Sequence, residues 1–223
     1  MTSNLSQFIK FLKEEISENQ ISSALTIDVI DPRDRLENKS EICVKPKNTQ
    51  EISKILKLAN KFLIPIIPIG GSTGLVGGQI ASQSNHVTLS LEKLDTINFF
   101  KDSNLLYVQS GAILSNIKKL AFNNGRLFPL SLASEGSCQI GGNLATNAGG
   151  LNVIKYGNVR DLCLGLEAVL PCGQIVSTMK PLKKNNMGFD LKNLLIGSEG
   201  TLGVITSTIL KTFPIPKDPI SIF

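Results

Sequence analysis

One stretch constrains the fold of this chain more than any other: "IPIIPIGGSTGLVGGQ", from Ile64 to Gln79. The apolar run Ile64–Ile69 is typical of a core strand, although prolines interrupt it. Five glycines, one serine and one threonine follow within residues 70–78. Glycines let a ligand approach bare backbone, and successive free amides can bind an anion. The pattern therefore predicts a strand that ends either in a phosphate-binding loop or in an ordinary glycine-rich turn.

The loop matches neither of two familiar nucleotide motifs. No Lys-Ser or Lys-Thr pair follows the glycines, as it does in nucleoside-triphosphate loops, and the G-x-G-x-x-G spacing of dinucleotide-binding folds is missing. The segment before it predicts a helix over residues 50–62, with Thr49 as its N-cap. Its apolar stripe comprises Ile52, Ile55, Leu56, Ala59 and Phe62. With a short strand in "EICVKP", these elements predict a β-α-β unit.

The rest of the chain alternates in a similar way. Strands are expected in "HVTLSL" and "LLYVQSGA", and Leu114, Ile117 and Ala121 mark a helix after them, so we expect a second β-α-β-like unit. "LEAVLPCGQIVST" predicts a hairpin, and "LGVITSTILKTFPIP" a final strand. At the other end, Leu5, Phe8 and related residues predict an amphipathic helix, followed by a polar connection to residue 40.

Composition excludes several classes of protein. A chain of 223 residues with 42% hydrophobic content can form one large domain or two small lobes. No run of eighteen apolar residues predicts a membrane span. Glutamates occupy the place of a signal peptide's apolar region, so we expect a cytoplasmic protein. With two tyrosines and no tryptophan, the net charge of +5 does not indicate a nucleic-acid partner.

Few residues offer chemistry of their own. The four cysteines, Cys43, Cys138, Cys163 and Cys172, lack C-x-x-C spacing, so we expect no metal site and largely buried, reduced thiols. The single histidine, His86, has no acid or nucleophile beside it in the sequence and is assigned a structural or surface role. No catalytic residue is therefore expected in this chain.

Two further glycine clusters follow. "GSCQIGGNLATNAGG" spans Gly136–Gly150, and "GSEGTLG" spans Gly197–Gly203. Such small side chains and amides suit neither a stable helix nor a strong strand. One cluster could be a tight packing loop, but the three together suggest backbone that lies against an extended ligand.

The three clusters resemble the FAD-linked oxidase family, which has the vanillyl-alcohol-oxidase or PCMH-type FAD-binding domain. The most similar branch contains D-lactate, glycolate (large subunit) and D-2-hydroxyglutarate dehydrogenases. The matching stretches are "PIGGSTGLVGG", "FPLSLASEGSCQIGGNLATNAGGLNVIKYGNVRDLCLGLEAVLP" and "FDLKNLLIGSEGTLGVIT". Cys172, in the turn of the predicted hairpin, stands where relatives commonly have an aspartate; this departure affects only the hairpin.

The resemblance implies an α+β fold of two packed lobes with FAD between them. Residues 1–40 are then an N-terminal helix and connection, and residues 41–216 the FAD-binding domain, with lobes of about 41–91 and 93–214. Relatives continue into a cap domain that binds the substrate. Only its start, residues 217–223, is expected here, and the cap domain itself is expected to be absent.

The resemblance also assigns cofactor-binding residues. The first loop would hold the FAD pyrophosphate, the second cluster would surround the flavin and ribityl chain, and the third would line the cofactor. The residues carried over are Gly70, Gly71, Ser72, Thr73, Gly74, Gly77, Gly78, Gly136, Ser137, Gly142, Asn143, Thr146, Asn147, Gly149, Gly150, Glu199, Gly203 and Ile205. Since the first loop has no histidine for a covalent tether, FAD is expected to be noncovalent.

The implied function is the FAD-binding portion of a dehydrogenase that oxidises a small 2-hydroxy acid to the 2-oxo acid. A chain that carries the cap would be its partner, because one peripheral histidine cannot supply both a base and a cation for the substrate. A non-catalytic flavin-binding fragment or remnant is the alternative. An NADPH-dependent reductase of enolpyruvyl-UDP-N-acetylglucosamine is a weaker one.

Overall fold

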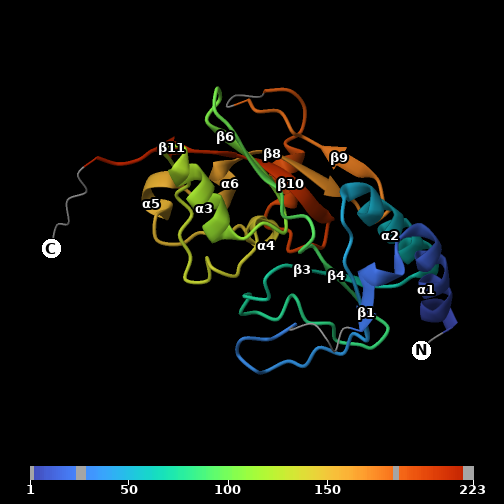
Figure 1. The fold of residues 1–223 in the computed structure, drawn as a ribbon. Helices are drawn as coiled ribbons and strands as arrows, with labels where there is room; N and C mark the ends of the chain where they lie inside the picture. Colours follow the sequence, from blue (N-terminus) through green and yellow to red (C-terminus); the bar gives the residue numbers. More distant parts are fainter. Residues whose placement is uncertain (1–2, 24–28, 183–185, 218–223) are drawn as a thin grey trace.

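A computed structural model describes residues 3–23, 29–182 and 186–217, and shows the expected α+β fold of two packed lobes (Figure 1). In the first lobe a four-stranded sheet is covered by two helices that pack on each other. In sheet order its strands are β1 (Ile21–Ser23), β2 (Ile42–Val44), β4 (Val87–Ser90) and β3 (Ile66–Ile69). The helices are α1 (Ser3–Glu15) and α2 (Thr49–Phe62), and a 3₁₀ turn, η1 (Glu18–Gln20), precedes β1.

The second lobe is built on an antiparallel sheet of five strands. In sheet order these are β5 (Ile97–Phe100), β6 (Leu105–Gln109), β10 (Val204–Lys211), β8 (Cys163–Val169) and β9 (Ile175–Ser177). A small ladder pairs β7 (Arg126–Leu127) with β11 (Phe213–Pro214). The helices of this lobe are α3 (Leu114–Asn123), α4 (Ile140–Ala145), α5 (Val153–Tyr156), α6 (Val159–Leu162) and α7 (Leu191–Leu195).

The expected second β-α-β-like unit is wrong. The "HVTLSL" strand, β4, belongs to the first sheet, where it runs parallel to β2 on one side and β3 on the other. The next strands, β5 and β6, form an antiparallel pair in the other lobe. Apolar alternation marks a strand but does not say which strand it pairs with, and all four residues of β4 are buried.

The first β-α-β unit is confirmed, with one correction at the start of its helix. The N-cap of α2 is Asn48, whose side chain accepts a hydrogen bond from the Glu51 amide at 2.9 Å. Thr49 is instead the first helical residue, and its hydroxyl donates to Glu167 of β8 at 2.7 Å. Of the expected stripe, four residues are buried, and Phe62 stacks on Phe11 of α1.

The two lobes share part of their core. Val169 at the end of β8 and Val204 at the start of β10 pack with the first lobe's buried cluster. Ser53 of α2 donates a hydrogen bond to the carbonyl of Gly173, in the turn of the predicted hairpin, at 2.5 Å. These contacts fix the edge at which the glycine clusters meet.

The ends of the chain add two points. The first sheet includes β1, which precedes Glu41, so this lobe draws on residues before the expected boundary. Of the expected start of a cap, residues 218–223 lie outside the described residues. None of the described helices is long and apolar enough to cross a membrane.

Candidate functional site

The first glycine cluster forms an open loop after β3, from Gly70 to Gln79. Among the described residues none accepts a hydrogen bond from the backbone amides of residues 71–74. Ser72 has a left-handed backbone, with φ of 50°, as found in the nests that present successive amides to an anion. The loop therefore offers free backbone donors at the boundary between the lobes.

The second cluster packs against this loop. A Cβ on Gly71 would lie 2.0 Å from the carbonyl oxygen of Ser137, so only glycine permits this approach of two backbones. The chain then turns into α4, which is seated on the second sheet: the Gly141 amide donates to the Ser110 carbonyl at 2.8 Å. A Cβ on Gly141 would in turn lie 2.5 Å from the Ser110 side chain.

The third cluster is attached to the carboxyl end of α4. The amides of Gly197 and Glu199 donate to the carbonyls of Leu144 and Ala145, at 3.0 and 2.8 Å. Glu199 has a left-handed backbone, with φ of 54°, which is uncommon for a residue other than glycine and is found at functional sites. This geometry brings Glu199 to the same opening as the glycine loop.

Together the three clusters line a continuous groove between the lobes. Its outer pocket, beside the glycine loop, is lined by Gly70–Gly74, Val76, Gly78, Gln79, Cys138, Asn143 and Thr146. Its inner pocket, toward the second sheet, is lined by Ile69, Leu91, Ser110, Gly141, Gly200, Gly203, Val204 and Ile205. Residues common to both are Pro68, Gly70, Gln139, Gly142, Ala145 and Glu199.

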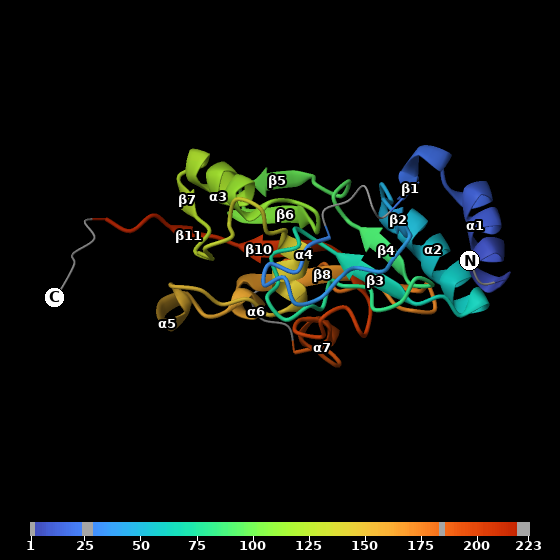
Figure 2. The ribbon, with the colours of Figure 1, turned by 90° about the horizontal axis from the view of Figure 1, so that it is seen from below.

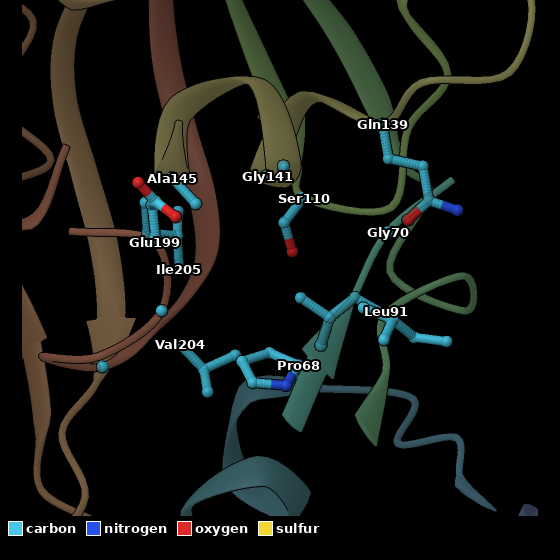
Figure 3. Close-up of a pocket in the computed structure, with 14 residues that line it drawn as sticks. Pro68, Gly70, Leu91, Ser110, Gln139, Gly141, Ala145, Glu199, Val204 and Ile205 are labelled. Carbon is cyan, nitrogen blue, oxygen red and sulfur yellow. The ribbon is translucent and has the colours of Figure 1, made fainter. Parts of the chain in front are cut away.

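Figure 3 shows how the inner pocket is arranged. The Ser110 hydroxyl points into the cavity, with Glu199 on one side, Gln139 and Gly70 on the other, and Pro68 and Val204 closing it below. The pocket thus has apolar walls and a few convergent polar groups, as small-molecule and cofactor sites do.

Three buried polar atoms of the groove have no hydrogen-bond partner within the described part of the chain. They are Ser110 Oγ, Gln139 Oε1 and Asn143 Oδ1. A buried polar atom without a partner costs about 1–3 kcal/mol, so native proteins seldom retain one without reason. A molecule bound in the groove would supply the missing donors and acceptors.

The electrostatics of the groove depend on backbone rather than on charged side chains. Glu199 is the only carboxylate among the residues named as its lining, and no lysine, arginine or histidine is among them. Cys138, in the outer pocket, is buried. Any anion in the outer pocket would therefore be held by the free amides and by the hydroxyls of Ser72 and Thr73.

Of the expected cofactor-binding residues, twelve line the groove: Gly70, Gly71, Ser72, Thr73, Gly74, Gly78, Gly142, Asn143, Thr146, Glu199, Gly203 and Ile205. The other six line neither pocket: Gly77, Gly136, Ser137, Asn147, Gly149 and Gly150. Some of these have structural contacts instead. Asn147 Oδ1 accepts a hydrogen bond from the Arg160 amide at 3.3 Å, and Ser137 supplies the carbonyl beside Gly71.

The sequence reasoning missed Gln139, which lies within the second glycine cluster but was not singled out, and Ser110, which lies outside the three clusters. Ser110 directly follows β6, and a polar residue where a strand meets a turn was the available signal. Two other residues are placed elsewhere: His86 does not line the groove, and Cys172 is exposed while the other three cysteines are buried. Burial raises the pKa of the Cys43 thiol to about 11.

Known proteins are similar to this chain in sequence and in fold. The D-2-hydroxyglutarate dehydrogenase of Bos taurus, described as mitochondrial, is 41% identical over 179 residues, which is 80% of this chain and 33% of the relative. The D-lactate dehydrogenase of Anaerostipes hadrus is 40% identical over 185 residues, 82% of this chain and 38% of the relative. The chain thus spans about a third of the length of these curated relatives.

Solved structures agree on the fold. An alkyldihydroxyacetonephosphate synthase superposes with a TM-score of 0.82 at 24% identity, over 96% of this chain and 41% of that one. The grass pollen allergen Phl p 4, with glucose dehydrogenase activity, gives 0.79 at 18% identity, over 94% of this chain and 44% of that one. At such identities these likenesses establish the fold alone.

The groove fits the cofactor that this fold family implies. The free amides of residues 71–74 suit a pyrophosphate, and the unpartnered atoms of Ser110, Gln139 and Asn143 suit the polar edges of ring and sugar groups. A family described as "FAD binding domain" matches residues 40–179, more than half of the chain. The chain belongs to the FAD binding domain family.

Proposed function

We propose that this chain is the FAD-binding portion of a flavoprotein dehydrogenase that oxidises a small 2-hydroxy acid, of the glycolate, D-lactate or D-2-hydroxyglutarate type, to the 2-oxo acid. The observation that carries the proposal is the identity of about 40% to D-2-hydroxyglutarate and D-lactate dehydrogenases over about four fifths of the chain. This identity favours the hydroxy-acid branch over the NADPH-dependent reductase.

In this proposal the chain's residues hold and orient the cofactor. The amides of residues 71–74 and the hydroxyls of Ser72 and Thr73 bind the pyrophosphate, while Ser110, Gln139 and Asn143 hydrogen-bond to ring and ribityl groups. The eighteen residues named above remain the proposed cofactor set. FAD, when bound, accepts the two electrons and the hydrogen that leave the hydroxyl-bearing carbon of the acid.

The other half of the reaction needs groups that the groove does not contain. Oxidation of a hydroxyl requires a base for its proton, and the substrate carboxylate requires a cation beside it. Glu199 is the only carboxylate among the lining residues, no cation is among them, and His86 is not one of them. We propose that a partner chain carrying a substrate-binding domain supplies these groups.

The lack of a base and a cation among the lining residues also favours a second candidate, a flavin-binding chain with no catalysis of its own. Anaerobic bleaching of the flavin absorbance by D-lactate, glycolate and D-2-hydroxyglutarate separates the two. We expect no bleaching by the FAD-loaded chain alone, and bleaching by one of the acids once a polypeptide matching the remaining part of a relative is added. Persistent absence of bleaching would favour the non-catalytic chain, and rapid bleaching by the lone chain would contradict the assignment of the base to a partner.

Two finer points belong to the same proposal. FAD is bound noncovalently, because the loop over residues 70–79 contains no histidine; acid precipitation should release all flavin into the supernatant. The proposed location is the cytosol, although the name of the Bos taurus relative includes "mitochondrial". Fractionation of cells that express the chain would decide the location.

A further inference from the structure

The glycine loop is held in place by a segment that lies outside the family match. Residues 29–39 run between the first two strands of the first lobe and lie alongside the loop in both views (Figures 1 and 2). The match to the FAD binding domain family begins at residue 40. We call residues 29–39 the strap. The strap thus lies outside both the family match and the lining of the groove, yet it contacts the glycine loop.

The strap is organised around one buried carboxylate. The side chain of Asp31 is fully buried and accepts hydrogen bonds from the amides of Arg33 and Arg35, at 3.2 and 3.0 Å. The Arg35 guanidinium lies 3.6 Å from the same carboxylate. The turn that results directs Arg35 across to the glycine loop.

Three contacts then connect the strap to the loop. Arg35 Nη2 donates to the Leu75 carbonyl at 2.6 Å. The side-chain amide of Gln79 donates to the Ile30 carbonyl of the strap at 3.0 Å and, within the loop, to the Gly74 carbonyl at 2.9 Å. Leu36 packs over Gly77, where a Cβ would lie 2.3 Å from its methyl carbon.

The pattern of these bonds matters more than their number. A loop that keeps the amides of residues 71–74 free for a ligand cannot use those amides to hold its own shape. Its carbonyls are held instead: that of Gly74 by the side chain of Gln79 at the end of the loop, and that of Leu75 by Arg35 of the strap. The backbone amides of residues 71–74 thus remain free for a ligand, because the carbonyls of Gly74 and Leu75 make the hydrogen bonds that hold the loop.

We infer that Arg35 is a positioning residue of the cofactor site: by anchoring the Leu75 carbonyl and the Asp31 turn together, it fixes the loop in the shape that presents its free amides to the FAD pyrophosphate. This inference rests on the proposed FAD site and deepens it. Arg35 lines neither pocket, so its effect passes through the loop backbone at Leu75.

The test compares four forms of the full chain: the parent, Arg35→Ala, Arg35→Lys and Arg33→Ala. Arg33 is the matched control because its side chain is exposed and makes no hydrogen bond or ion pair with the described residues. FAD affinity is measured by titration of flavin fluorescence. Hydrogen exchange of the cofactor-free chain is followed by mass spectrometry, peptide by peptide.

We expect Arg35→Ala to weaken FAD binding about tenfold, which corresponds to about 1.4 kcal/mol and lies in the range of hydrogen bonds made by charged groups. Exchange should rise in peptides that cover residues 74–81 and not in the rest of the first lobe. Arg35→Lys should recover part of the affinity, since lysine keeps a charged donor but lacks the fork that spans two partners. Arg33→Ala should match the parent.

Other outcomes overturn the inference in distinguishable ways. If the parent binds FAD and Arg35→Ala binds it within twofold, the inference fails while the proposed function stands. If exchange rises throughout the first lobe of Arg35→Ala, its effect is general destabilisation and the positioning role is refuted. If the parent itself does not bind FAD, the proposed function and this inference both fail.

Discussion

The closest backbone approach in the groove gives the sharpest prediction, the replacement of Gly71 by alanine. The added Cβ would lie 2.0 Å from the Ser137 carbonyl oxygen, 2.8 Å from its carbon and 3.1 Å from the Cys138 Cα. All three atoms are backbone, so no side-chain rotation relieves the clash. The loop and the second glycine cluster must separate by more than 1 Å to reach the 3.4 Å of ordinary contact.

Two effects follow from that separation, one on stability and one on FAD binding. Overpacking of this kind costs about 1–3 kcal/mol of folding stability, which for a chain of this size lowers the unfolding midpoint by roughly 2–10 °C. Displaced amides lose hydrogen bonds to the pyrophosphate, each of about 1.5–3 kcal/mol with a charged acceptor. We therefore expect FAD affinity to fall by about ten- to a hundredfold.

The assay is a fluorescence titration with FAD, paired with thermal unfolding of the cofactor-free chain. Gly136→Ala is the stability control, since a Cβ there meets no atom within 4 Å and its φ is not positive; its unfolding midpoint should match the parent's. Full affinity and an unchanged midpoint in Gly71→Ala would refute the close approach on which the groove depends.

Three more predictions test separate features. Gly142→Ala should weaken FAD binding without lowering stability, because its Cβ would enter the open groove and meet no atom within 4 Å outside its own helix; a lower unfolding midpoint would contradict this. Ser110→Ala should stabilise the cofactor-free chain by about 1 kcal/mol, since it removes a buried hydroxyl without a partner, yet weaken FAD binding. Burial acts to raise the pKa of Asp31, but the backbone amides of Arg33 and Arg35 and the charge of Arg35 outweigh burial, so the pKa is lowered from 3.8. The ionised carboxylate should therefore stabilise the fold at neutral pH, and this stabilisation should be lost below about pH 4. Asp31→Asn should remove this pH dependence from the free energy of unfolding, which is measured in urea.

Much of the fold could be predicted from local pattern. Apolar residues at helical spacing located α1, α2 and α3, and the glycine loop after β3 was evident from composition. Strand partners could not be predicted, because pairing depends on contacts distant in sequence: β4 lies between β2 and β3 only once the chain has returned from the loop. Periodicity therefore identified the strand and misassigned its sheet.

Helix α4 shows a different limit. Its sequence, "IGGNLA", has a poor intrinsic helix propensity, and the segment was expected to be irregular. The helix forms because Ile140 and Leu144 are fully buried in the second lobe and the Ile140 and Gly141 amides donate to carbonyls of Ala112 and Ser110. Tertiary packing overrides the propensity, and no window of sequence around α4 contains the partners that do so.

The choice between a ligand cradle and a packing loop, open from the sequence, is not exclusive. Gly71 and Gly150 are glycine for packing, since at each a Cβ would lie 2.0 Å from a backbone carbonyl oxygen of the chain itself. At Gly142 a Cβ would meet no neighbouring atom within 4 Å, so packing does not require glycine there, whereas a ligand in the groove would. The two kinds of glycine depend on each other: the packing glycines bring the backbones together, and the open one leaves the groove between them free. Substitutions that separate folding from FAD binding at neighbouring glycines therefore test the same geometry from its two sides.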